Sequence, residues 1–138
     1  MGSRLVSFLL DTHVWIWTQA EPNAIGGKAR TLLETTRDDL CVSAVSSLEI
    51  ARLVSAKLLQ VQGSLDRWVR TAIDSIEARS IDVDHRIAIE AYKLPGRFHK
   101  DPADRLLVAT ARLNDLTLVT ADERILAYRA VRTLNARA

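Results

Sequence analysis

With 138 residues the chain is the size of one domain, and we expect a single domain over residues 1–138. Hydrophobic residues at 48%, charged residues at 26% and a net charge of +2 are ordinary for a folded globular protein. The lone Cys41 excludes an internal disulfide and fits a reducing compartment, so we predict a cytoplasmic protein. The apolar stretch before Asp11 is too short for a signal-peptide core or a membrane span, so we expect no membrane partner.

The predicted elements alternate between strands and helices. Short apolar runs predict buried strands at residues 5–10, 40–45, 116–120 and 130–134, with a weaker one at 80–83. Helical patterns are expected at about 28–37, 46–58, 65–76, 84–93, 102–114 and 122–127. This alternation predicts an α/β fold in which helices flank a mainly parallel central sheet.

Several acidic side chains stand where helices are expected to begin. SSLE places Glu49 three residues after Ser46, DPAD places Asp104 three residues after Asp101, and TADE carries Asp122 at another start. Taken singly, each of these acids is explained by capping. Asp11 is different, because it ends an apolar run and Thr12-His13 is a less usual helix opening.

The expected topology brings these acids together. Asp11 follows the first strand, Glu49 the second and Asp122 the strand at 116–120, while Asp104 can join them from its own helix start. Ligands of open parallel sheets bind at the carboxyl ends of the strands. Carboxylates about 5 Å apart would repel by roughly 3 kcal/mol per pair at an effective dielectric constant of about 20. Such a cluster calls for Mg²⁺ or Mn²⁺, and for metal-assisted cleavage of phosphodiester bonds.

Four motifs occur in a set order, and they read LLDTHVW, SxxE within SAVSSLEI, DPADRLLVATA and LVTADERI. They resemble the acidic motifs of PIN-domain ribonucleases, most closely the VapC-type toxins of bacterial toxin-antitoxin pairs, over residues 5–133. The resemblance implies a PIN-like fold and a Mg²⁺-dependent endoribonuclease that cleaves RNA. It also implies a homodimer and a small VapB-type antitoxin that blocks the site. The metal ligands and catalytic residues that it implies are Asp11, Glu49, Asp104 and Asp122.

Some assignments stay open within these motifs. We prefer Asp104 as the ligand in DPAD because it opens an apolar run, which leaves Asp101 as the N-cap or, alternatively, as a further ligand. Thr12 and Thr120 could orient carboxylates or water, and a local backbone hydrogen bond is equally compatible with the sequence. Trp15 and Trp17 are two residues apart and cannot share one helix face, so we expect one in the core and the other toward a partner.

The loop sequence PGRFHK precedes the DPAD helix. Its basic side chains, Arg97, His99 and Lys100, could hold an RNA backbone, or they could simply be solvated. Two other functions remain alternatives. A HAD-type phosphatase would need a second aspartate where this chain has His13. A catalytically silent RNA-binding or scaffold module would keep the acids only as helix caps.

Overall fold

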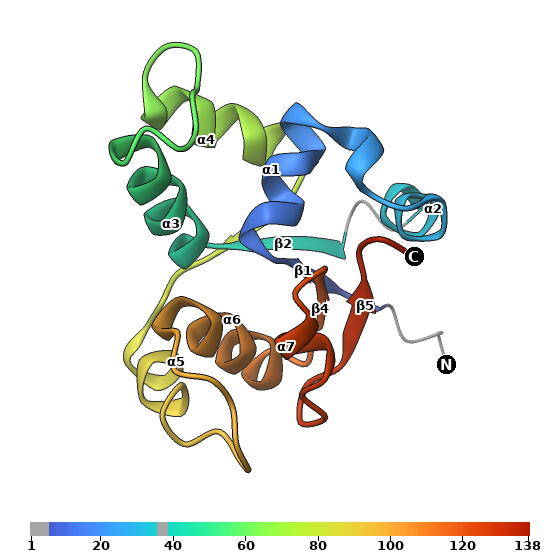
Figure 1. Ribbon diagram of the computed structural model, residues 1–138, viewed down its shortest axis with the longest axis vertical. Coiled ribbons are helices and arrows are strands. Elements are labelled where there is room, and N and C mark those ends of the chain that lie inside the picture. The colour runs from blue at the N-terminus through green and yellow to red at the C-terminus, as the bar shows by residue number, and fades with distance from the viewer. Residues whose placement is uncertain (1–5, 36–38) are drawn as a thin grey trace.

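The computed structural model describes residues 6–35 and 39–138, which form alternating strands and helices. Figure 1 shows them in chain order: β1 (Phe8–Leu10), α1 (Thr12–Ala20), the 3-10 helix η1 (Pro22–Ala24), α2 (Gly27–Thr35), β2 (Leu40–Ser43), α3 (Ala44–Ser55), α4 (Leu65–Asp74), β3 (Arg79–Ile81), α5 (His85–Glu90), α6 (Pro102–Leu113), β4 (Thr117–Thr120), α7 (Glu123–Leu126) and β5 (Thr133–Asn135).

The strands form one parallel sheet in the order β3-β2-β1-β4-β5. The central strand β1 pairs with β2 on one side and with β4 on the other, so that Leu9 lies opposite Cys41 and Leu118. All three side chains are buried, as expected for a parallel sheet that is covered on both faces. The predicted α/β fold with a mainly parallel sheet flanked by helices is confirmed.

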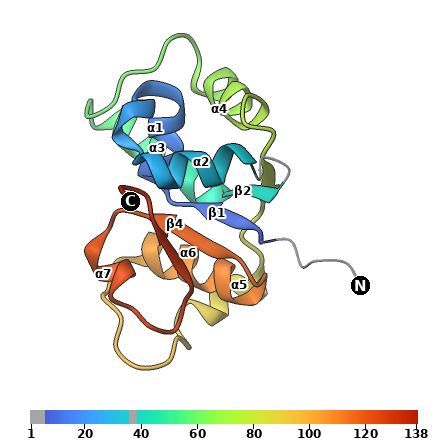
Figure 2. The ribbon, with the colours of Figure 1, turned by 90° about the vertical axis from the view of Figure 1, so that its right-hand side faces the viewer.

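The helices cover the two faces of the sheet as separate layers. Helices α1 to α4 lie on one face and α5 to α7 on the other, as both views show (Figures 1 and 2). Successive strand residues point to opposite faces, so Leu9 packs in a cluster with Leu107 of α6 and Leu10 in a second cluster with Trp15 of α1. The strands therefore hold two hydrophobic cores together and align their carboxyl ends at one rim.

The observed strands are shorter than the apolar runs that predicted them. The run at 40–45 ends as a strand at Ser43, because the Ser43 side chain accepts a hydrogen bond from the Val45 N–H and starts α3. The run at 5–10 forms a strand only over Phe8–Leu10, and its residue 5 lies outside the described residues. Residues 36 and 37 of the helix expected at 28–37 also lie outside them.

Helix α1 is the main element that the sequence analysis missed. Its sequence THVWIWTQA is rich in β-branched and aromatic residues, which favour strands in isolation. Burial overrides that preference, because Val14 and Trp15 are fully buried and the Trp15 indole N–H donates to the carbonyl of Ala72, 3.1 Å away. Trp15 is thus the core tryptophan, while Trp17 is half-buried, with the guanidinium of Arg137 over its ring.

Across residues 6–35 and 39–138, the helices are all too short or too polar to cross a membrane. The cytoplasmic location stays a prediction.

Candidate active site

Three of the predicted acids follow neighbouring parallel strands. Asp11 comes directly after β1, Glu49 lies on α3 directly after β2, and Asp122 comes two residues after the end of β4. Because β1 lies between β2 and β4, these acids share the carboxyl rim of the sheet. Asp104 enters from the first turn of α6, a helix that packs against α3.

Asp11 occupies the N-cap position of α1 without serving as its cap. Within the described residues its side chain makes no capping hydrogen bond; instead its Oδ2 accepts a hydrogen bond of 2.6 Å from the Thr120 hydroxyl. The side chain is only 7% exposed. Burial raises the pKa of Asp11, and the Thr120 hydrogen bond works in the opposite direction. Its carboxylate therefore points across the rim toward the end of β4.

Glu49 does not belong to a capping box, contrary to the sequence expectation. Helix α3 begins at Ala44, so Ser46 is already inside its first turn and buried, while Ser43 provides the cap. The Thr12 hydroxyl lies 2.8 Å from Oγ of Ser46 and 3.1 Å from Oε1 of Glu49. Thr12 and Thr120 thus each orient a carboxylate, which was one of the two roles left open for them.

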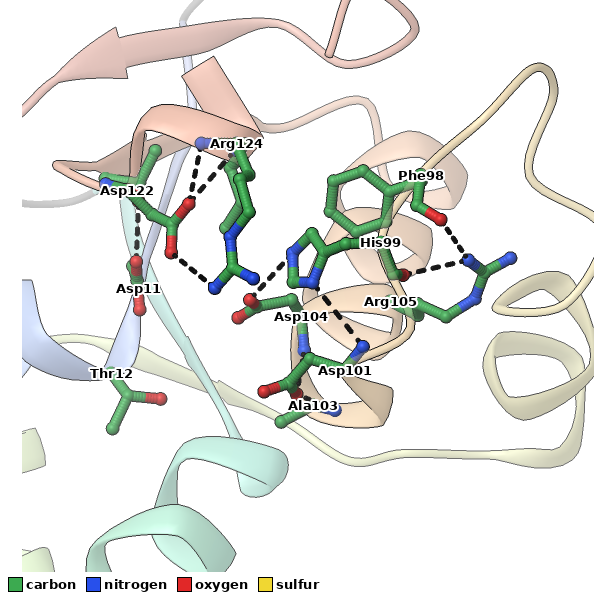
Figure 3. A network of polar contacts seen from close by, with 12 residues as sticks. Asp11, Thr12, Phe98, His99, Asp101, Ala103, Asp104, Arg105, Asp122 and Arg124 are labelled. Carbon is green, nitrogen blue, oxygen red and sulfur yellow. Dashed lines mark hydrogen bonds and ion pairs between the residues drawn. The ribbon is translucent and has the colours of Figure 1, made fainter. Parts of the chain in front are cut away.

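Asp101 has the capping role that was expected for it in the DPAD segment, and Asp104 does not share that role. Oδ1 of Asp101 accepts hydrogen bonds from the N–H groups of Ala103, at 2.9 Å, and Asp104, at 3.2 Å, so Asp101 is the N-cap of α6. The Asp104 carboxylate faces His99, with Oδ2 3.0 Å from Nε2 (Figure 3).

The electrostatics of Asp104 link the predicted acids to one another. Its pKa is raised from 3.8 to about 7, first by burial and then by the negative charges of Asp101, Asp11, Asp122 and Glu49. Each of the other predicted acids therefore acts on Asp104. An excess of negative charge remains at this rim.

His99 is a neighbour of Asp104 that the sequence analysis treated only as part of a basic loop. Its Nδ1 accepts a hydrogen bond of 3.4 Å from the N–H of Asp101, so the proton of a neutral ring sits on Nε2, facing Asp104. The 3.0 Å approach lacks hydrogen-bond geometry, since among the described residues this Nε2 finds no hydrogen-bond partner. Burial first, and then the charge of Arg124, lower the pKa of His99, which favours the neutral ring.

Arg105 of α6 fixes the loop that carries His99. Its guanidinium donates to the carbonyl oxygens of Ala91, at 2.8 Å, and of Phe98 and His99, both at 3.1 Å. It also lies over the ring of Tyr92, 4.9 Å from the ring centre. The position of His99 therefore depends on side-chain contacts, and its proximity to Asp104 is not visible in a sequence motif.

Asp122 caps α7 and faces a cation. Its Oδ1 accepts hydrogen bonds from the N–H groups of Arg124, at 2.8 Å, and Ile125, at 3.3 Å, while Oδ2 lies 3.6 Å from the Arg124 guanidinium (Figure 3). The Asp122 N–H donates to the Thr120 hydroxyl, which itself donates to Asp11. Thr120 therefore ties two of the predicted acids together.

Comparison with known proteins agrees with this arrangement. The PIN domain family matches residues 8–131. The chain belongs to the PIN-domain family. It is 34% identical to Ribonuclease VapC22 of Mycobacterium tuberculosis over 125 residues, which cover 91% of this chain and 94% of that protein.

Solved structures share this PIN fold at lower identity. VapBC2 from Rickettsia felis, bound to a DNA fragment from their promoter, matches with a TM-score of 0.68 and 15% identity, covering 94% of this chain and 98% of that one. A toxin-antitoxin complex from Klebsiella pneumoniae matches with a TM-score of 0.66 and 20% identity over the same shares. These likenesses confirm the predicted PIN-like fold.

The carboxylate oxygens at the rim of this PIN domain are of the chemical type that binds hard divalent cations. PIN-domain ribonucleases generally use divalent metal ions. The rim offers carboxylate oxygens, the ligands that Mg²⁺ and Mn²⁺ prefer, and its excess negative charge raises the pKa of Asp104. In the described ranges, however, no three acidic, histidine or cysteine side chains stand close enough together to hold a metal ion as they are now placed. Oδ2 of Asp104 faces His99, and Oδ2 of Asp122 faces Arg124.

Proposed function

We propose that this PIN domain is a Mg²⁺-dependent endoribonuclease, with Mn²⁺ as a substitute ion, and the toxin of a toxin-antitoxin pair. The observation that carries the proposal is the placement of Asp11, Glu49 and Asp122 after neighbouring parallel strands, with Asp104 in the first turn of α6. The raised pKa of Asp104, to which the other three acids contribute, supports it. Like charges that act on one another at the carboxyl rim of a parallel sheet are relieved by a divalent cation. The proposed metal-binding and catalytic residues are Asp11, Glu49, Asp104 and Asp122.

The four carboxylates would hold the cation from two sides. Asp11 and Glu49, oriented by threonine hydroxyls, form what we call the inner side, and Asp104 and Asp122, which face His99 and Arg124, form what we call the outer side. When bound, the cation supplies a nucleophilic hydroxide from water and stabilises the leaving oxygen of the phosphodiester. Without a metal, Asp104 has a pKa of about 7 and can hold a proton at its carboxyl group near neutral pH, and metal binding would displace that proton.

Two observations support RNA as the substrate. The curated relative is named a ribonuclease. Arg97 and Lys100 are exposed on the loop that leads to Asp104, where their charges can hold a phosphate backbone next to the acids. His99 takes no part in that basic surface, because it is turned inward toward Asp104.

The proposed partners are a small antitoxin and a second copy of the chain. Solved structures with the same fold include toxin-antitoxin complexes, which supports the antitoxin. An antitoxin that places an arginine or lysine beside the acids would supply the positive charge that they attract and would block the site. The homodimer rests on the family resemblance alone.

The catalytically silent module remains a second candidate. Two observations favour it. Among the described residues, no three candidate ligands lie close enough to hold a metal ion, and Asp101 and Asp122 serve as helix caps. The HAD-type phosphatase loses its support, because the chain belongs to the PIN-domain family.

One experiment separates these functions. Protein purified free of any antitoxin should cleave RNA in Mg²⁺ or Mn²⁺, stop when EDTA is added and resume when the metal is restored in excess. Cleavage that continues unchanged in EDTA would rule out the metal mechanism. A folded protein that neither binds Mn²⁺ nor cleaves RNA would support the silent module.

A further inference from the structure

Arg124 brings a positive charge into the acidic site. It is the second residue of α7, and its guanidinium lies 3.6 Å from Oδ2 of Asp122. In Figure 3 the side chain points from α7 toward the space between Asp122 and the pair of His99 and Asp104. The guanidinium therefore stands where the outer carboxylates of the proposed metal site would have to meet.

A second observation concerns His99, on the other side of this space from Asp122. After burial, which has the larger effect, the positive charge of Arg124 is the next cause that lowers the pKa of His99. The guanidinium thus acts on Asp122 on one side and on the neighbour of Asp104 on the other. The effect of the Arg124 charge therefore extends beyond its ion pair with Asp122 at the start of α7.

The ion pair of Arg124 is weak enough to exchange. The Arg124 side chain is 64% exposed and its 3.6 Å distance to Asp122 is long for a charge-assisted hydrogen bond. Exposed ion pairs of this kind generally contribute little to stability. A divalent cation carries twice the charge and approaches carboxylate oxygens more closely, so it can displace the guanidinium.

A displaced Arg124 side chain is well suited to bind a phosphate of the RNA substrate. The planar guanidinium presents several N–H donors that match the oxygens of a phosphate, and it keeps its charge at any physiological pH. On α7, the released side chain stays beside the acids, at the place where an RNA phosphate would have to lie for cleavage.

We propose that Arg124 is an exchangeable cation of the acidic site: it balances the outer carboxylates without metal and binds an RNA phosphate once a metal occupies them. The proposal rests on the metal-dependent RNA cleavage proposed above. It assigns a substrate-binding residue outside the four acids.

The chain offers a matched control in Arg132. Its guanidinium lies 2.8 Å from Oδ1 of Asp115 and its side chain is 59% exposed, so it is also a surface arginine paired with an aspartate. This second pair lies away from the four acids, between the end of α6 and β5. Substituting Arg132 therefore removes one positive charge and one ion pair without touching the site.

The test compares Arg124→Gln, Arg124→Lys and Arg132→Gln in the full chain. Mn²⁺ binding is measured by calorimetry without RNA, and KM and kcat are measured on a short RNA at several salt concentrations. Arg124→Gln should bind Mn²⁺ about threefold to tenfold more tightly, because one repelling charge is gone. Its KM for RNA should rise about tenfold, with a shallower dependence on salt.

The two control variants sharpen these expectations. Arg124→Lys should keep the Mn²⁺ affinity of the wild type, because its charge remains, and should lose part of the RNA affinity with the planar fork. Arg132→Gln should leave both quantities unchanged. Asp122 caps the backbone N–H of residue 124, so the fold is not expected to depend on this side chain.

The outcomes separate this inference from the function on which it rests. If the wild type binds Mn²⁺ and cleaves RNA while Arg124→Gln behaves as Arg132→Gln, the role of Arg124 is wrong and the proposed function stands. Tighter Mn²⁺ binding with an unchanged KM would also overturn it, because no phosphate contact was lost. If the wild type neither binds Mn²⁺ nor cleaves RNA, the proposed function fails and the inference falls with it.

Discussion

The two sides of the acidic rim are held in place by different chemistry. On the inner side, neutral hydroxyls orient the carboxylates, since Thr120 donates to Asp11 and Thr12 lies 3.1 Å from Glu49. On the outer side, nitrogen-bearing side chains face the carboxylates, with His99 beside Asp104 and Arg124 beside Asp122. We call these the hydroxyl side and the nitrogen side.

This difference separates a fixed half of the site from an adjustable one. Thr12, Ser46 and Thr120 are fully buried, and their hydrogen bonds link the start of α1 to α3 and to the end of β4. Arg124, by contrast, is largely exposed and only loosely paired. We therefore expect loss of a hydroxyl on the hydroxyl side to act mainly on folding and loss of a carboxylate charge there to act on catalysis, while substitutions on the nitrogen side act mainly on charge balance.

The largest effect is expected when the hydroxyl side loses a charge. Asp11→Asn should reduce RNA cleavage about a hundredfold or more, because a metal ligand typically supports several kcal/mol of transition-state stabilisation. The asparagine oxygen can still accept the Thr120 hydrogen bond, so the variant should fold. Cleavage assays with thermal melts check both points, with Asp115→Asn as a surface control. Full activity in Asp11→Asn would remove Asp11 from the site.

Glu49→Gln tests the other carboxylate of the hydroxyl side. The Gln oxygen can still accept from Thr12, and the cap of α3 is at Ser43, so the helix should be unaffected. Loss of the charge should lower cleavage by about tenfold or more. Circular dichroism and RNA cleavage are the measurements. Wild-type activity in a folded variant would mean that Glu49 only braces Thr12.

Thr12→Val breaks the hydroxyl link and keeps the shape. The buried Ser46 hydroxyl would lose its partner, which should destabilise the protein by about 1 to 2 kcal/mol. Cleavage should fall only a few fold, since every carboxylate remains. Urea unfolding measures the stability, and Thr31→Val on the exposed part of α2 serves as a control. A loss of activity as large as that of Asp11→Asn would show that the hydroxyl itself is essential.

The pH dependence of the metal-free protein probes the nitrogen side. The pKa of Asp104 is about 7 in the folded chain, against an ordinary value of 3.8, so folded protein keeps a proton that unfolded chain has released between these values. Stability in EDTA should therefore fall as the pH rises through this window and level off above it. Thermal melts across the window check this. Asp104→Asn should flatten the slope, and an equal slope in that variant would assign the effect to other groups.

The sequence predicted most of the fold and of the candidate site, because both follow from local patterns. Apolar runs located the strands, and the order of the acids along a parallel sheet placed Asp11, Glu49 and Asp122 at one rim. Helix α1 was missed because its residues favour strands in isolation, whereas burial of Val14 and Trp15 in the core favours the helix.

The residues that position the acids were harder to predict than the acids themselves. Ser46 was expected to cap a helix, but α3 starts earlier because Ser43 provides its cap. The nearness of His99 to Asp104 depends on an irregular loop that Arg105 holds through backbone carbonyls. Such contacts carry no periodic signal in the sequence.

The central claim is that the four carboxylates jointly bind a divalent cation, and paired thermal melts of wild type and Asp104→Asn test it most directly. In EDTA the variant should be as stable as the wild type or more stable, because one repelling charge is gone. In saturating Mg²⁺ the gap should close or reverse, since a metal that binds only folded protein stabilises it by RT ln(1 + [L]/Kd). A destabilisation of Asp104→Asn that is the same in both buffers would contradict the claim and assign Asp104 to its helix.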